Sequence, residues 1–271
     1  MLSFKSLKKD FDKKAIKIEK RYRLVISVVL LTSLMIISSF FGFDKVTIFL
    51  PILIILTYFF TYFSLIEGIN KVSWFGLFLM PQLVTIAFYF VYYLFPGRWL
   101  TRVPFSMIYG VSIYAVLLCS NIFNIGVEKS LGLYRAAFSI NFFYQTIVSF
   151  LIFNLIFSLK QIFLVNMLAA GIVGFILGLH LYWTIRLKKH IETEALHLSL
   201  VTGLVLCELA MIISFIPLKM PVYSLFLTSS YYSLAGLTYS HIDQRLFKET
   251  VREYVSVFIF VLIITLLSIS F

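Results

Sequence analysis

The sequence has little charge. Asp, Glu, Lys and Arg make up 13% of its 271 residues, whereas soluble globular domains hold roughly a quarter. Hydrophobic residues make up 61%, and the mean hydropathy is +0.99. A water-soluble fold would have to cover its exterior with these apolar side chains, so the composition excludes such a fold and places the chain in a lipid bilayer.

Alternating polarity and a cysteine framework are missing as well. A membrane β-strand needs about 10 residues that alternate apolar and polar, but runs such as residues 24–41 are continuously apolar. Backbone groups in lipid must then be paired within helices. Only two cysteines occur, Cys119 and Cys207, both inside apolar runs and without metal-ligand spacing. We expect two buried thiols and no disulfide or zinc site.

Lys and Arg are absent from nine stretches long enough to cross a bilayer. An apolar core about 30 Å thick needs about 20 helical residues. The sequence therefore predicts an all-α, polytopic transmembrane helical bundle with nine spans. The stretch 222–240 is rich in Ser and Thr, so eight spans are the alternative. The nine stretches are 24–43, 46–66, 74–94, 103–123, 138–157, 162–185, 195–216, 222–240 and 255–271.

The basic residues between these stretches predict an orientation. With the N-terminus inside, the 23 Lys and Arg residues divide 18 to 5 between the cytoplasmic and outer sides. Without the span 222–240 the division weakens to 15 and 8. Because cytoplasmic loops are enriched in Lys and Arg, we expect nine spans in the cell (cytoplasmic) membrane, with the N-terminus in the cytoplasm and Phe271 outside.

Residues 1–23 form a basic segment ahead of a single transmembrane domain, residues 24–271. The segment holds nine Lys and Arg against three acidic residues, which favours anionic lipid head groups. No soluble module combines these charges with aromatic residues, so nucleic acid is not expected as a partner. An amphipathic surface helix is predicted, with a solvated leader as the alternative, from the spacing of Phe4, Leu7, Phe11, Ala15, Ile18 and Tyr22.

Two spans carry helix-packing signals. In 162–185, small or polar residues recur every four positions and predict a seam for close packing on another helix of the same chain: Asn166, Ala170, Gly174, Gly178 and Tyr182. In 74–94, Pro81 removes one backbone hydrogen bond, and we expect the Gln82 amide to satisfy the freed group.

The span 138–157 carries a polar stripe of Asn141, Gln145 and Ser149 at intervals of four. Such a stripe should face protein or water rather than lipid. Hydrogen bonding between helices is the expected role, worth about 0.6 kcal/mol per contact on average. A polar pathway is the alternative.

Glu208 is the only charged residue inside any predicted span, and no span supplies a Lys or Arg to pair with it. An acidic side chain in the bilayer costs about 2.5–3.5 kcal/mol, so we expect it to be protonated and to donate a hydrogen bond. Tyr231, on the antiparallel neighbour, is at a suitable depth. A water-bridged proton path through His197 and His180 to Glu208 is the alternative to a packing role for Glu208.

No motif predicts chemistry. The acidic loop residues show no metal-ligand spacing such as H-E-x-x-H, and no nucleophile lies beside a base. No catalytic residue, cofactor or metal site is therefore expected, and enzyme activity is not favoured.

One segment carries a family resemblance. The stretch 120–125, SNIFNI, followed by 133–137, LYRAA, resembles a segment of uncharacterised bacterial multi-pass membrane proteins of a domain-of-unknown-function family. The resemblance covers the central third of the chain. It implies a polytopic helical fold in a bacterial cytoplasmic membrane and brings no activity with it.

The expected role is a packed, non-enzymatic membrane component or accessory subunit, in which Glu208 holds helices together and the membrane-protein partner is not identified. A small-solute or proton-coupled transporter that uses Glu208, the polar stripe and Pro81 is the second hypothesis. A lipid-modifying membrane enzyme is a distant third.

Overall fold

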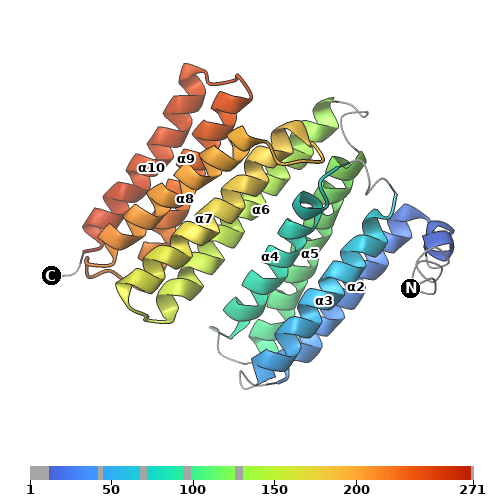
Figure 1. Ribbon diagram of the computed structural model, residues 1–271. Coiled ribbons are helices and arrows are strands. Elements are labelled where there is room, and N and C mark those ends of the chain that lie inside the picture. Colours follow the sequence, from blue (N-terminus) through green and yellow to red (C-terminus); the bar gives the residue numbers. More distant parts are fainter. Residues whose placement is uncertain (1–11, 42–44, 68–71, 94–98, 126–130, 270–271) are drawn as a thin grey trace. The chain divides into compact units, whose positions relative to one another are not determined.

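The computed structural model describes residues 12–41, 45–67, 72–93, 99–125 and 131–269, and within these ranges it contains helices and no strand (Figure 1). The long helices correspond one for one to the nine apolar stretches. They are α2 (Lys20–Ser39), α3 (Val46–Leu65), α4 (Trp74–Tyr92), α5 (Trp99–Ile125), α6 (Leu131–Ser158), α7 (Phe163–Arg186), α8 (Thr193–Ile213), α9 (Met220–Ile242) and α10 (Lys248–Leu267).

Eight of these helices are long and apolar enough to cross a membrane, counted over the described residues. The prediction of a polytopic, all-α membrane protein is confirmed. Helix α9 does not reach the same hydropathy, although its 23 residues make it as long as its neighbours.

The chain forms two compact units, Met1–Asn141 and Phe142–Phe271, and the boundary between them falls within α6. In the first unit, α2 packs against α3 and α5, and α4 also packs against α3 and α5. Helices α3 and α5 also contact each other, and the four helices form a closed bundle. Its centre is filled by side chains that are fully buried: Leu31, Leu53, Leu77, Val84, Tyr109 and Val116.

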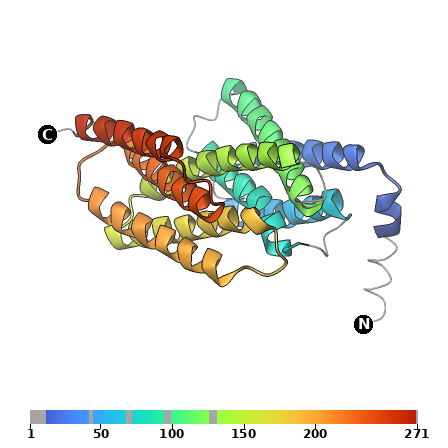
Figure 2. The same cartoon turned by 90° about the horizontal axis from the view of Figure 1, so that it is seen from above.

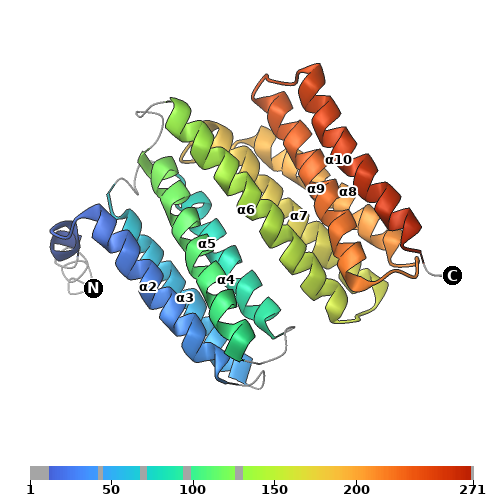
Figure 3. The same ribbon diagram turned by 180° about the vertical axis from the view of Figure 1, so that it is seen from behind.

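In the second unit, α7 and α8 form the most extensive helix pair, and α9 packs against α10, α8 and α7. Figures 2 and 3 show α9 between α10 and the α7–α8 pair. Helix α6 joins this unit through aromatic stacking of Phe142 on Tyr232 and of Phe157 on Tyr223, with ring centroids 5.1 and 4.9 Å apart.

The position of α9 explains its low hydropathy. Most of its serine hydroxyls donate to carbonyls of the same helix; Ser224, Ser230 and Ser240 each bond the residue four positions earlier. Hydroxyls paired in this way and buried against other helices do not meet lipid. Helix α9 lies along three helices that are apolar enough to span the membrane.

Two local predictions are wrong. Residues 12–16 are helical, but the helix breaks at 17–19 and α2 begins at Lys20, so one continuous amphipathic face up to Tyr22 does not form. Ala15 is buried, whereas Ile18 and Tyr22 are exposed; Phe4, Leu7 and Phe11 lie outside the described residues. The Gln82 amide bonds the carbonyl of Ile54 on α3, 3.0 Å away, rather than the carbonyl in its own helix that Pro81 frees.

Candidate functional site

The sequence suggests a polar site within the membrane from five residues: Gln145, His180, His197, Glu208 and Tyr231. Three of these five meet in the interior of the second unit. Gln145 of α6 lies between His180 of α7 and Tyr231 of α9. The Tyr231 hydroxyl donates to Oε1 of Gln145 over 2.9 Å, and Nε2 of Gln145 lies within hydrogen-bond distance of Nδ1 of His180. Their exposed fractions are 0% for Gln145, 2% for His180 and 0% for Tyr231. We call these three residues the polar junction.

The hydrogen bonds of the polar junction constrain its proton positions. With Oε1 of Gln145 occupied by the Tyr231 hydroxyl, its NH₂ group faces His180. Nδ1 of His180 must then accept, so a neutral imidazole carries its proton on Nε2. The junction therefore links α6, α7 and α9 through the side-chain amide of Gln145.

A second buried pair extends the polar interior to α8. The hydroxyl of Tyr182 on α7 lies 2.7 Å from Oγ1 of Thr202 on α8, and Thr202 also donates to the carbonyl of Leu198. Both side chains are almost completely buried. Polar contacts thus reach from α7 to α6, α8 and α9 within one unit.

Helices α7 and α8 approach closely along the predicted seam. Asn166, Ala170, Gly174 and Tyr182 are buried. A Cβ atom added to Gly174 would lie 2.4 Å from Cδ1 of Leu206, and one added to Gly171 would lie 2.9 Å from Cβ of Cys207. The seam is used within the chain, as predicted.

The other two predicted site residues do not join the junction. Glu208 and His197 lie on α8 and are both exposed, on the side of the helix opposite its buried face. The Tyr231 hydroxyl bonds Gln145 rather than Glu208, and the described residues offer Glu208 no hydrogen bond. His180 is buried on α7, so the structure does not bring the proposed path from His197 through His180 to Glu208 together. The buried face of α8 comprises Ala195, Ser199, Thr202, Gly203, Leu206, Ala210 and Ile213.

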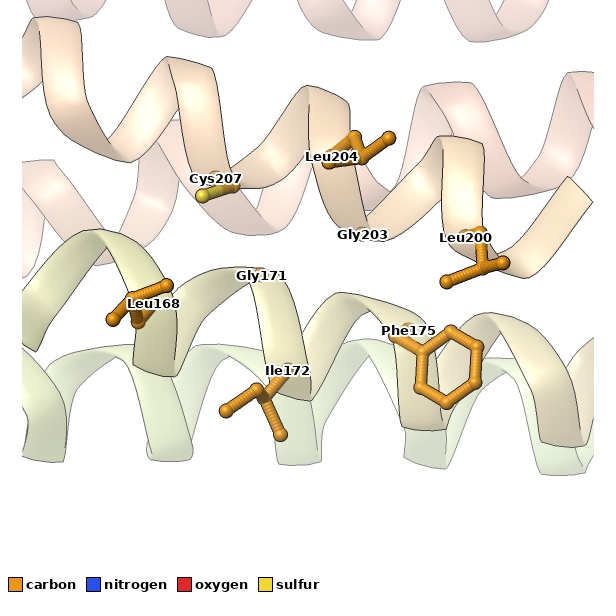
Figure 4. Close-up of a pocket in the computed structure, with 8 residues that line it drawn as sticks. All are labelled: Leu168, Gly171, Ile172, Phe175, Leu200, Gly203, Leu204 and Cys207. Atoms are coloured by element: carbon orange, nitrogen blue, oxygen red, sulfur yellow. The ribbon is translucent and has the colours of Figure 1, made fainter. Parts of the chain in front are cut away.

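An apolar groove lies beside Glu208. It has a volume of about 270 Å³ and is lined from both α7 and α8, as Figure 4 shows. Gly171 and Gly203 form its floor, where the two backbones approach each other. Its other lining residues are Leu168, Ile172, Phe175, Leu200, Leu204 and Cys207.

The first unit contains a buried arginine that the sequence analysis missed. Arg23 lies inside α2 with 0% exposure and pairs with Glu67, which follows α3. Asn124 of α5 donates to the carbonyls of Leu65 and Glu67 at 2.9 and 2.6 Å. The predicted spans end where charged residues begin, so Arg23 lies outside the first predicted span. The sequence does carry a signal for a helical Arg23, because this residue directly precedes the apolar run that begins at Leu24.

A hydroxyl network crosses the same unit. Oγ1 of Thr85 lies 3.2 Å from Oγ1 of Thr57 and 3.0 Å from the hydroxyl of Tyr109, which joins α3, α4 and α5. Within the described part of the chain, no group of three His, Cys, Asp or Glu side chains could hold a metal ion.

The fold and the buried polar contacts define a multi-pass α-helical membrane protein. The chain belongs to the family described as protein of unknown function (DUF5656), whose model matches residues 68–268. The match covers most of the chain, well beyond the central third in which the resemblance was noted. No curated protein and no solved structure matches it.

Proposed function

We propose that this protein is a packed, non-enzymatic component of the cell membrane that serves as an accessory or assembly subunit for another membrane protein. The polar junction is the observation that supports the proposal. Gln145, His180 and Tyr231 are at most 2% exposed and bond one another. A transport route needs water access to its polar groups, whereas a sealed network of this kind fixes how helices pack.

Energetics favour a structural role for the junction. Burying a polar group without a partner costs about 1–3 kcal/mol, while a hydrogen bond between membrane helices contributes about 0.6 kcal/mol on average. The junction therefore adds little net stability but penalises arrangements in which α6, α7 and α9 are misaligned. Such a penalty keeps the three helices in one arrangement, which suits a subunit whose outer surface binds another membrane protein.

Proton flux in vesicles tests the proposal. The full-length protein is reconstituted in liposomes with an internal pH-sensitive dye, and a proton gradient is driven by a potassium diffusion potential. We expect the same flux as in liposomes without protein. A larger flux that His180→Gln abolishes, while the variant stays folded, would replace this proposal with a proton pathway.

Proton-coupled transport is the second candidate because His180 is a titratable group buried deep in an apolar helix bundle. Rotation of the Gln145 amide would exchange its donor and acceptor sites, and Nδ1 of His180 could then carry a proton. This candidate predicts a proton flux above that of protein-free liposomes, which His180→Gln abolishes. The vesicle measurement with the parent and this variant separates the two candidates.

The orientation belongs to the same proposal. The N-terminus faces the cytoplasm, Phe271 lies outside, and the basic residues of the N-terminal segment bind anionic head groups. Lys13, Lys14 and Lys17 are exposed, while the Tyr62 hydroxyl donates to the carboxylate of Asp12 over 3.1 Å and anchors the segment to α3. Reporter fusions at Phe271 test this topology; a cytoplasmic reporter signal would contradict nine spans.

A further inference from the structure

Residues 12–19, directly before α2, are held on the first unit by two polar contacts, and we call them the docked segment. Nη1 of Arg23 donates to the Ala15 carbonyl over 3.4 Å. The Tyr62 hydroxyl donates to the carboxylate of Asp12, at 3.1 and 3.3 Å from its two oxygens. Ala15 is only 3% exposed. The docked segment therefore packs on the helices rather than extending away from them.

Arg23 is the buried centre of this arrangement. Its side chain is 0% exposed and pairs with the carboxylate of Glu67. The backbone carbonyl of Glu67 in turn accepts a hydrogen bond from Asn124 of α5. A buried guanidinium depends on such partners, because the loss of one leaves an uncompensated charge. One side chain on α2 thus connects the docked segment with the end of α3 and, through Glu67, with α5.

The two contacts also fix the level of the docked segment relative to the bilayer. Arg23 lies in the first turn of α2, which begins at Lys20. Tyr62 lies in the last turn of α3, which ends at Leu65. Both helices are apolar enough to span a membrane, so these turns lie where the hydrocarbon core meets the head groups. Figure 1 shows the short helix of the docked segment, in dark blue, beside the start of α2.

The exposed charges of the docked segment are mainly basic. The Asp12 carboxylate accepts from Tyr62 and is only partly exposed. Glu19 is exposed, against three exposed lysines: Lys13, Lys14 and Lys17. Basic side chains at this level are attracted to the negative surface potential of anionic lipids. The charge of the segment therefore complements an anionic membrane surface.

Apolar side chains lie among these lysines. Ile16 and Ile18 have exposed fractions of 53% and 38%. At the level of the head groups, apolar side chains can enter the boundary between head groups and acyl chains, while lysines next to them contact phosphate. The docked segment thus combines the two features of an interfacial membrane contact.

We propose that Arg23 is a positioning residue that holds the docked segment at the membrane surface, where its three lysines bind the phosphate groups of anionic lipids. A free basic leader would lose conformational freedom each time it bound lipid. Docking on the protein removes that loss in advance. The inference rests on the contact with anionic head groups proposed above, and it adds the buried ion pair as the structural requirement for that contact.

Cysteine labelling in lipid nanodiscs tests the proposal, because both faces of a nanodisc are open to solvent. The full-length chain carries Ile18→Cys in a Cys207→Ser background, while Cys119 is buried and stays. The rate of labelling by an uncharged maleimide is compared between discs of phosphatidylcholine and discs that also contain phosphatidylglycerol. We expect phosphatidylglycerol to lower the rate about fivefold. Salt at about 1 M should restore the rate, because it screens exposed charges.

The lysines are tested first. Lys13→Gln with Lys17→Gln should reduce the effect of phosphatidylglycerol to less than about twofold. The matched control is Lys248→Gln with Arg252→Gln, which removes two exposed basic residues of α10 and should keep the fivefold effect. If the first variant keeps that effect as well, the proposed contact with anionic head groups is overturned, and the positioning role with it.

The positioning role is tested with all lysines in place. Arg23→Met with Glu67→Gln removes both charges, so neither is left unpaired in the folded protein. We expect this double variant to reduce the effect of phosphatidylglycerol to less than about twofold, as the lysine variant does. Thermal unfolding in phosphatidylcholine discs checks that it is folded.

Tyr62→Phe releases the docked segment on its other side and should give an effect between those of the parent and the double variant. Its matched control is Tyr58→Phe, one turn earlier on α3, where the hydroxyl accepts from Trp74 rather than contacting the docked segment. Equal labelling of Tyr62→Phe and Tyr58→Phe, in a protein whose lysine variant has lost the effect, would overturn the positioning role alone. This comparison decides the outcome if the double variant unfolds.

Discussion

Helix α7 is held by α8 and by α6 in two different ways. Against α8, glycines on both helices bring the backbones together, and a Cβ added to Gly203 would lie 2.8 Å from the carbonyl oxygen of Gly171. Against α6, contact depends on long side chains, with Gln145 reaching His180. Lipid removes the hydrophobic drive between helices, so packing contacts and hydrogen bonds remain. Close packing should therefore be the less tolerant of change.

The largest expected effect is at the close contact. Gly203→Ala introduces a methyl group against the Gly171 carbonyl and the Phe175 backbone, which cannot move aside as a flexible side chain would. We expect the free energy of unfolding to fall by about 1–3 kcal/mol, measured by thermal unfolding in detergent.

Gly132→Ala is the matched control, because a Cβ at Gly132 meets nothing within 4 Å. Alanine is the better helix former by about 1 kcal/mol, so this variant should be as stable as the parent or slightly more stable. Equal stability of Gly203→Ala and Gly132→Ala would show that the α7–α8 pair is not tightly packed.

The polar junction should give the next effect. Gln145→Leu removes the amide from Tyr231 and His180 and should lower the free energy of unfolding by about 1–2 kcal/mol. Adding Tyr231→Phe removes the hydroxyl that has lost its acceptor. The double variant should therefore lose less free energy of unfolding than the sum of the losses of the two single variants. Additive losses measured by thermal unfolding would mean that the two side chains are not coupled.

Thr202 offers a smaller test, because its hydrogen bond to Tyr182 lies between the closely packed helices α7 and α8. Thr202→Val keeps the volume and should cost about 0.6 kcal/mol, the average for such contacts. Thr265→Val is the control, since the Thr265 hydroxyl donates only to Val261 of its own helix. A Thr202→Val loss no larger than that of the control would show that the α7–α8 hydrogen bond adds nothing.

The smallest effect concerns the charged turn between α7 and α8. A hydrogen bond from Lys188, with the charge of Arg186, lowers the pKa of Glu192 below its ordinary value near 4.5. The ionised form is favoured in the folded protein, so the stabilisation is complete above pH 4.5 and is lost as the pH falls through the lowered pKa.

Thermal unfolding between pH 7 and pH 3 measures this contribution, with Glu192→Gln as the comparison. The parent should lose slightly more stability than the variant at the acid end. Parallel pH profiles would show that the ion pairs of this exposed turn contribute nothing.

Sequence alone predicted the helices because the bilayer sets their length, and it predicted the α7 seam because small residues at intervals of four share one face. Gln145, His180 and Tyr231 are all among the predicted candidates, but the sequence pairs His180 and Tyr231 with Glu208 and places Gln145 in a separate polar stripe. Counting residues along a span gives the depth of a side chain in the membrane. It does not show which side of the helix faces the neighbouring helices. The small residues Ser199, Gly203 and Ala210 mark the buried side of α8, and that signal could have placed Glu208 on the opposite side.

The serines of α9 bear on how membrane spans are counted. A hydropathy scale averages the polarity of the individual side chains, and by that average α9 is too polar to cross a bilayer. A hydroxyl that donates to a backbone carbonyl of its own helix no longer needs a hydrogen-bond acceptor in the lipid or on a neighbouring helix. Ser224, Ser230 and Ser240 each make such a bond. A helix can be polar in composition and apolar in the surface it presents. The spacing of its hydroxyls relative to its carbonyls is then a better guide than its mean hydropathy.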